Sequence, residues 1–330
     1  MSPFQMTRAL PEDATHAALL ADVSHGLLAV PKTLPPKWLY DAYGSALFER
    51  ITQLPEYYPT RAEQEILVAR AAEIAAVTRA RELVELGSGS SYKARRLLAA
   101  FPRAACYVPV DVSESALQEA GETLVRAYPQ LAVHALVADF TSGLSLPTSA
   151  DGRLVAFLGG TIGNLLPRQR ADFLTMVRAQ LLPGDFLLLG VDLVKDPKTL
   201  VAAYDDAAQI TSAFNKNVLT VVNRELGADF DLARFEHVAR WDAEREWMEM
   251  RLRSRCAQSV KISALDVEVD FAAGEEMRTE VSAKFRRPGV EAELHAAGLH
   301  MVRWWTDPQG RFALCLSTPA PKARVVGERG

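Results

Sequence analysis

The sequence predicts an α/β protein in which a doubly wound, mostly parallel β-sheet is joined to a second unit of the α+β type. Between residues 61 and 195, short apolar runs alternate with helical patterns, and each run ends in Gly, Asp or Ser. Strands that alternate with helices are typical of a parallel sheet covered on both faces. From about residue 196 this alternation stops, and single polar and apolar residues alternate instead, as in half-buried antiparallel strands.

The expected elements of the sheet follow one another along the chain. Apolar runs predict buried strands at residues 82–86, 106–112, 133–140, 154–159 and 186–193. Helical patterns lie at residues 62–80, 92–100, 115–127 and 167–182. The last of these helices begins with Pro167 in its first turn and ends before Pro183 and Gly184, which are the usual start and stop signals.

The later part of the chain predicts an insertion between two parts of the sheet. Residues 211–225 have a helical pattern, and residues 246–255 alternate like an antiparallel strand with one buried face. The chain then returns to the first style with a helix at 290–297 and two strands, 301–305 and 312–317. A turn sequence, Asp-Pro-Gln-Gly at 307–310, joins these two strands, so we expect an antiparallel hairpin.

Composition and charge limit the possible functions. The chain has 330 residues, of which 49% are hydrophobic, so it can bury a large core. Its 41 acidic and 37 basic residues argue against a nucleic-acid partner, which usually requires a basic face. The three cysteines are widely spaced, which favours neither a disulfide framework nor a metal site. No signal peptide or apolar run of about 18 residues is visible, so we expect a cytoplasmic protein without a membrane partner.

The stretch ELGSGSSYK at residues 85–93 lies between a predicted strand and a predicted helix. Gly87 and Gly89 allow a positive φ and the close approach of a ligand at the carboxyl edge of the sheet. The third glycine of the dinucleotide fingerprint is missing, so a pyrophosphate on the helix N-terminus is less well supported. A tight turn without a ligand remains the alternative.

Polar and aromatic residues follow the next two predicted strands. Asp111 comes at the tip of the second strand, where a carboxylate can accept both hydroxyls of a ribose. Asp139 and Phe140 come at the tip of the third, where they suit the amino group and the ring of an adenine. Any one such acid can instead be a helix cap or a turn residue. Three consecutive strand tips with suitable residues favour a nucleoside.

This order of features is similar to that of class I S-adenosylmethionine-dependent methyltransferases, in which an ELGSG-type loop faces the amino acid portion of the cofactor. The final hairpin also resembles the antiparallel sixth and seventh strands of that class. Five longer blocks resemble the histidine Nα-methyltransferases of ergothioneine biosynthesis: YDAYGSALF at 40–48, LPEYYPTR at 54–61, FLGGTIGN at 157–164, DLVKD at 192–196 and TEVS at 279–282.

The resemblance implies a reaction and a division of the chain. Members of that family transfer three methyl groups from S-adenosylmethionine to the α-amino nitrogen of L-histidine, without a metal, and so form hercynine. A methyltransferase core is then expected at residues 61–195 and 286–330. The N-terminal segment 1–60 and the insertion 196–285 are expected to form the substrate-binding domain.

The resemblance also assigns site residues. Gly87, Lys93, Asp111, Asp139 and Phe140 are expected to bind the cofactor. Tyr40 and Gly159 are expected to lie beside the reacting nitrogen. A glycine there is physically reasonable, because a nitrogen that gains three methyl groups needs space, although Gly159 and Gly160 could simply end a strand.

The remaining assignments concern the substrate. Its carboxylate needs hydrogen-bond donors, and Asn164 can supply one from its amide. The resemblance adds Tyr57 and Tyr204, although tyrosines more often pack in a core or an interface. Residues two apart in a strand share a face, so Glu280 and Ser282 can contact both nitrogens of one imidazole ring. Met250 offers an apolar wall. The alternative is a solvated strand face with Met250 in a core.

Two other functions remain open from the sequence alone. The first is a methyltransferase for another amino acid or small amine, and the second is a regulatory protein that binds a nucleotide without turnover. The sequence leaves the oligomeric state open, with a monomer as one option.

Overall fold

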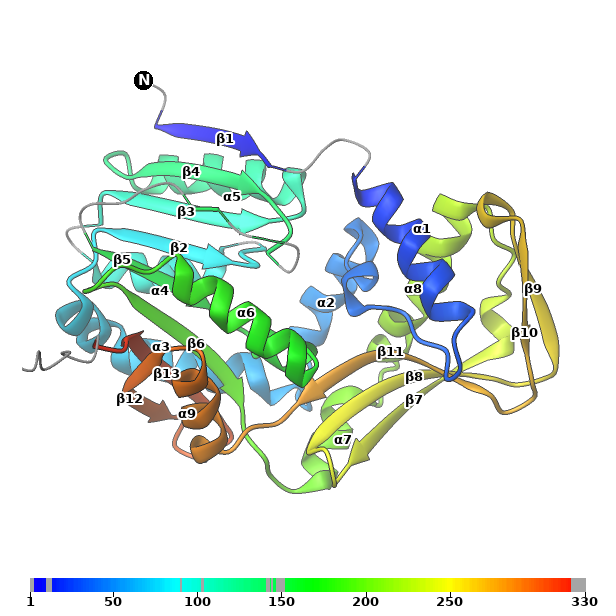
Figure 1. Ribbon diagram of the computed structural model, residues 1–330. Helices are drawn as coiled ribbons and strands as arrows, with labels where there is room; N and C mark the ends of the chain where they lie inside the picture. The colour runs from blue at the N-terminus through cyan, green and yellow to red at the C-terminus, as the bar shows by residue number, and fades with distance from the viewer. Residues whose placement is uncertain are drawn as a thin grey trace, which may run out of the picture.

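The computed structural model describes residues 3–9, 14–89, 91–101, 104–140, 143, 145–146 and 152–321. These residues form one large sheet, two smaller sheets and the helices around them (Figure 1). The strands of the large sheet lie in the order β1 (Phe4–Arg8), β4 (Ala132–Val137), β3 (Cys106–Asp111), β2 (Glu82–Leu86), β5 (Arg153–Phe157), β6 (Phe186–Asp192), β13 (Phe312–Pro319) and β12 (Leu299–Thr306). Residues 322–330 of the predicted core lie outside the described part of the chain.

The predicted fold class is confirmed. The first six strands of this order pair in parallel, whereas β13 is antiparallel to both β6 and β12. Helices α3 (Tyr58–Thr78), α4 (Tyr92–Ala100) and α5 (Glu114–Ala127) cover one face, and α6 (Pro167–Ala179) and α9 (Arg287–Ala296) cover the other. Consecutive strand residues such as Leu83 and Val84 enter different cores, because side chains alternate across a sheet.

The strand order reverses between β2 and β5. The chain runs outward from β2 through β3 to β4 and then returns to continue from β5 to β6 in the opposite direction. In an open α/β sheet, a crevice forms at the carboxyl ends of the strands at such a point, and ligands bind there. The tips of β2 and β5 therefore mark the expected site.

A second body of structure packs beside these strand tips (Figure 1). Its elements are α1 (Ala14–Leu27), η1 (Pro36–Leu39), α2 (Ala42–Thr52), α7 (Pro197–Tyr204), α8 (Ile210–Leu226), η3 (Leu232–Arg234), β7 (Phe235–Asp242), β8 (Trp247–Ser254), β9 (Gln258–Ile262), η4 (Ser263–Leu265), β10 (Val267–Phe271) and β11 (Glu276–Ala283). Strands β11, β8 and β7 form an antiparallel sheet, and β9 pairs with β10. Leu47, Val218 and Leu252 lie in the core that this sheet shares with α1, α2 and α8.

Strand β1 departs from the sequence analysis, which placed all of residues 1–60 with the insertion. It pairs in parallel with β4 and forms one edge of the large sheet. Phe4 packs against α5 at Gly121, where a Cβ atom would lie 2.2 Å from the phenylalanine ring. The pattern of these five residues is too short to indicate a strand, and the contact that fixes them comes from a distant segment.

Most other boundaries lie within a few residues of the predicted ones. The largest difference at the site concerns the strand predicted over residues 133–140, which ends at Val137. Asp139 and Phe140 therefore lie in the segment that follows the strand.

No helix in the described part of the chain is long and apolar enough to cross a membrane.

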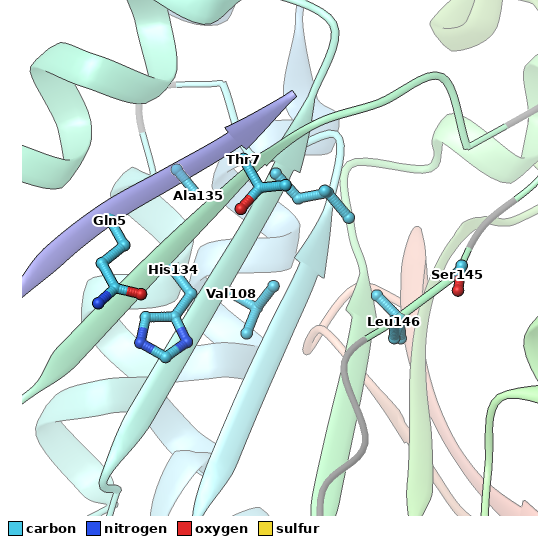
Figure 2. A pocket seen from close by; sticks show the side chains of 8 residues that line it. Gln5, Thr7, Val108, His134, Ala135, Ser145 and Leu146 are labelled. Atoms are coloured by element: carbon cyan, nitrogen blue, oxygen red, sulfur yellow. The ribbon is translucent and has the colours of Figure 1, made fainter. Parts of the chain in front are cut away.

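A cavity of about 400 Å³ lies at the β1 edge of the large sheet (Figure 2). Its lining comes from β1, β3, β4 and residues 145–146: Gln5, Thr7, Val108, His134, Ala135, Leu136, Ser145 and Leu146. No residue that the sequence analysis assigned to binding or catalysis lines this cavity.

Candidate active site

The glycine turn connects β2 to α4 at the point where the strand order reverses. Gly87 has a φ of 66° and Gly89 a φ of 47°, which are conformations that favour glycine. A Cβ atom on Gly87 would lie 3.5 Å from the ring of Phe140, whereas one on Gly89 would meet no atom within 4 Å. The turn therefore has an aromatic ring beside Gly87 and open space beside Gly89.

Asp111 is the last residue of β3, and its carboxylate organises this turn. One oxygen accepts the backbone N–H of Gly89 and the other accepts that of Ser113, each at 3.0 Å. These contacts match the role of a turn residue, which the sequence left open as the alternative. Each oxygen has a second lone pair, so the same carboxylate can also accept ribose hydroxyls.

Replacing Asp111 by asparagine should weaken the binding of the expected S-adenosylmethionine by about 1.5 kcal/mol, or roughly tenfold in the dissociation constant. This is the lower end of the usual contribution of a hydrogen bond to a charged group. Asparagine keeps one acceptor oxygen but turns its NH2 group toward the other backbone N–H, so a modest loss of stability should accompany the loss of affinity. Titration calorimetry measures the dissociation constant. An unchanged value, in a variant that remains folded, would remove Asp111 from the cofactor site.

The two residues after β4 differ in how closely they are tied to the turn. The ring of Phe140 lies edge-on against Phe157, with ring centroids 5.2 Å apart, and also faces Gly87. Asp139 is half-buried at the same edge of the sheet. The structure thus brings Gly87, Asp111 and Phe140 together around one turn.

Glu85 lies in β2, two residues before Gly87, and is a buried acid that the sequence analysis did not single out. The hydroxyl of Tyr107 donates to its carboxylate at 2.6 Å and also lies 2.9 Å from the Ser91 hydroxyl. Burial raises the pKa of Glu85 to about 7, although Tyr107 and Lys93 act in the opposite direction. An acid inside the apolar run 82–86 was the available signal.

This raised pKa predicts a pH dependence of stability. Between about pH 4.5, the ordinary value, and about pH 7, folded Glu85 binds more protons than the unfolded chain does. Its contribution to stability is therefore present below pH 4.5 and is lost as the pH rises to about 7. Glu85→Gln should flatten this part of the profile when the free energy of unfolding is measured by urea titration at each pH. A profile unchanged by the substitution would contradict the assignment.

Gly159 and Lys93 meet at the tip of β5, and Glu63 of α3 joins them. The backbone N–H of Gly159 donates to one oxygen of Glu63 at 2.7 Å, and Lys93 Nζ lies 2.7 Å from the other. Gly159 has a φ of 83°, and a Cβ atom there would lie 2.8 Å from Lys93 Nζ. The predicted cofactor residue and the predicted catalytic glycine are therefore neighbours.

Three tyrosines from different elements form the next part of the site. Tyr40 follows η1, Tyr57 precedes α3, and Tyr204 ends α7. Burial raises the pKa of all three phenols, and the negative charge of Glu280 raises each further. Tyr40 is 39% exposed as a residue, and its ring packs edge-on against Phe48 and Phe214, with ring centroids 5.5 Å and 5.2 Å apart.

Strand β11 supplies the polar face opposite the tyrosines. Glu280 pairs across the sheet with Met250 of β8, so their side chains lie on the same face. Ser282 accepts the hydroxyl hydrogen of Tyr204 at 2.7 Å. Glu280 is buried, which raises its pKa to about 7 against the opposing effects of Lys284 and a hydrogen bond from Asn164.

Asp192, at the end of β6, is the centre of a buried ionic cluster. Its carboxylate accepts the Tyr58 hydroxyl at 2.8 Å, and it pairs with Lys195 at 2.6 Å and Lys284 at 2.9 Å. Lys284 also donates to Tyr204 and Ser282, each at 2.8 Å. Burial alone would raise the pKa of Asp192, but Lys284 and Lys195 hold it below its usual value.

Comparison with known proteins identifies the family. The sequence model described as histidine-specific methyltransferase, S-adenosylmethionine-dependent, matches residues 19–319. The chain belongs to this family.

The similarity of this methyltransferase to its relatives covers most of its length. The histidine N-alpha-methyltransferase of Mycolicibacterium smegmatis is 56% identical over 311 residues, which are 93% of this chain and 97% of that protein. The protein of the same name from Mycobacterium tuberculosis is 54% identical over the same shares of both chains. Ergothioneine biosynthesis protein 1 of Neurospora crassa is 30% identical over 84% of this chain and 32% of that protein.

The sequence analysis of the methyltransferase missed several residues that the structure places at the site. For Glu63, the available signal was an acid three and four residues before Ile66 and Leu67, on the buried stripe of α3. For Lys284, the available signal was its position two residues after Ser282, where a strand that continued past β11 would place it on the same face. Within the described ranges, no three His, Cys, Asp or Glu side chains are grouped as a metal site would require.

Proposed function

We propose that this methyltransferase transfers three methyl groups from S-adenosylmethionine to the α-amino nitrogen of L-histidine and so forms hercynine, the first step of ergothioneine biosynthesis. The observation that carries the proposal is that Glu280 and Ser282, two residues apart in β11, are both buried and lie on the same face of the strand. A carboxylate and a hydroxyl on one strand face suit the two nitrogens of an imidazole. The two mycobacterial relatives, at 54% and 56% identity, bear a name that supports this substrate.

The chain offers a fitting partner for each part of the methyl donor. Asp111 would accept the ribose hydroxyls, and Asp139 and Phe140 would contact the adenine. Gly87 would let the donor approach the backbone of the turn closely, and Lys93 would form an ion pair with the donor's carboxylate. When bound, S-adenosylmethionine supplies an electrophilic methyl group.

The residues around the histidine backbone must present a neutral amine and exclude water, because an α-amino group is largely protonated at neutral pH. The raised pKa values of Tyr40, Tyr57 and Tyr204 keep these phenols neutral. A neutral phenol can accept an N–H from the amine or donate to the carboxylate. We assign Tyr40 to the amine and place Tyr57, Tyr204 and Asn164 beside the carboxylate.

Gly159 is expected to provide the space that successive methyl groups fill. Gly159→Ala should slow the last methylation about tenfold, because overpacking of a filled site costs ~1–3 kcal/mol. Mass spectrometry should then detect mono- or dimethylhistidine. Any side chain is strained at a φ of 83°, and the alanine Cβ would lie 2.8 Å from Lys93 Nζ, so the dissociation constant of the methyl donor is measured for the same variant; valine should obstruct more strongly.

Gly160→Ala is the matched control, since Gly160 has a φ of 70° but its Cβ direction points to Phe312 and Asp192 rather than to Lys93. It should cost stability without the accumulation of intermediates. If Gly159→Ala still gives only trimethylated product at the parent rate, the steric role of Gly159 is wrong.

The function itself is tested by incubating the protein with S-adenosylmethionine and each free amino acid, followed by mass spectrometry of the products. Trimethylated histidine is the expected product. Faster methylation of another amino acid or amine would replace histidine as the substrate. Binding of the donor without any methylated product would favour the regulatory alternative.

A further inference from the structure

Glu63 is a charged residue in an apolar setting. It lies on the face of α3 that packs on the large sheet, beside Ala62 and Ile66, and only 1% of its surface is exposed. Burying a carboxylate is costly unless it is paired and hydrogen-bonded. The two groups that it contacts should therefore indicate why an acid is present here.

These two groups belong to different strand tips and helices. One oxygen of Glu63 accepts the backbone N–H of Gly159, and the other lies 2.7 Å from Lys93 Nζ. Gly159 follows β5, and Lys93 lies in the first turn of α4, directly after the glycine turn. One carboxylate thus connects both sides of the crevice.

The neighbouring strands leave space for this arrangement. A Cβ atom on Gly190 of β6 would lie 2.4 Å from Glu63, and one on Gly159 would lie 2.8 Å from Lys93 Nζ. Glycine at these two positions therefore leaves free the space that the ion pair occupies. Within the described residues, the Lys93 ammonium pairs with Glu63.

The charges near the glycine turn explain why the position of Lys93 matters. Glu63 and Asp111 both act on the carboxyl group of Glu85, and so does Lys93 with the opposite sign. A ligand carboxylate near this turn would be repelled by the acidic side chains of Glu63, Glu85 and Asp111. The Lys93 ammonium must therefore lie close to it to offset this repulsion. The Lys93 side chain is 26% exposed, so N–H donors not directed to Glu63 can reach a ligand.

We propose that Glu63 is a positioning residue that holds Lys93 beside Gly159, where the ammonium receives the carboxylate of the methyl donor's amino acid portion. This inference rests on the donor named in the proposed function and is independent of histidine as the substrate. Glutamine cannot replace the acid. It has one oxygen for two donors, so either Gly159 or Lys93 would face an N–H group.

The test compares two ligands that share the thioadenosine group. S-adenosylhomocysteine carries the amino acid portion, whereas 5′-methylthioadenosine lacks it. Titration calorimetry on Glu63→Gln should show a dissociation constant about tenfold higher for S-adenosylhomocysteine and unchanged for 5′-methylthioadenosine. Glu65→Gln, the same substitution at an exposed position of α3, should change neither ligand. Equal losses for both ligands, or no loss for either, would overturn the inference.

A second variant separates positioning from direct contact. If Glu63 acts through Lys93, then Glu63→Gln combined with Lys93→Met should bind S-adenosylhomocysteine no more weakly than Lys93→Met alone. Additive losses would overturn the proposed route. The double variant also removes both charges, so it provides the comparison if Glu63→Gln alone does not fold.

These outcomes are distinct from those of the proposed function, because neither ligand contains histidine. A parent protein that binds S-adenosylhomocysteine more tightly than 5′-methylthioadenosine but methylates another substrate would contradict histidine and leave Glu63 in place. A parent that binds both ligands equally would overturn the role of Glu63, whatever substrate is methylated.

Discussion

Replacing Glu280 by alanine is expected to lower the apparent affinity for histidine about ten- to a hundred-fold. Glu280 is 7% exposed as a residue and lies on the same strand face as Ser282, and its charge raises the pKa of all three tyrosines. Without it, a ring N–H of the substrate would be unpaired in a largely buried pocket, which costs roughly 1.5–3 kcal/mol. Steady-state kinetics with histidine as the varied substrate measure the change in KM and kcat/KM.

Two controls make the interpretation of this variant specific. Glu280→Gln retains an acceptor oxygen and should lose less than alanine. The dissociation constant of the methyl donor should be nearly unchanged, because Glu280 lies in β11 and the glycine turn follows β2. The alanine variant should also discriminate less against phenylalanine, since the group that required a ring N–H is gone. A parent-like kcat/KM for histidine would remove the physical basis of the histidine assignment.

Replacing Asp192 by alanine is expected to lower the free energy of unfolding by about 3–5 kcal/mol, the usual loss when one partner of a buried ion pair is removed. Lys284 has no exposed side-chain surface and Lys195 has 10%, so both ammonium groups would lose their counter-charge in the interior. The hydroxyl of Tyr58 would lose its acceptor as well. Urea denaturation, followed by circular dichroism, measures the loss.

Asp192→Asn serves as the control of shape, because it keeps the side-chain volume and one acceptor oxygen. It should cost less than alanine. Combining Asp192→Leu with Lys284→Met removes one pair together and should recover part of the stability, because no lone charge from that pair remains. A loss below 1 kcal/mol for Asp192→Ala would mean that water reaches the two lysines.

Local pattern predicted the sheet and its crevice because the responsible physics is local. Strands buried on both faces, such as residues 82–86 and 186–192, need short apolar runs, and their tips carry the polar residues of the turns. The alternation of β11 likewise predicted that Glu280 and Ser282 share a face. What pattern could not supply is the partner of a buried charge.

The ionic clusters were missed for this reason. Tyr58 and Asp192 are 134 residues apart and meet where α3 lies against β6, and Tyr204 and Lys284 are 80 residues apart and meet where α7 lies beside the end of β11. Glu63 and Gly159 are separated by 96 residues. Each acid or lysine was visible as a polar residue in an apolar context, but its role depends on distant segments.

Strand β1 has a practical consequence for anyone who shortens this protein. Without residues 4–8, the outer backbone N–H and C=O groups of β4 would have no partner, and a second molecule could pair with them. The small apolar patch that Phe4 and Met6 cover on Leu117, Ala135 and Val137 would be uncovered at the same time. A truncated chain would therefore tend to self-associate through its sheet edge while the crevice at the strand tips kept its shape.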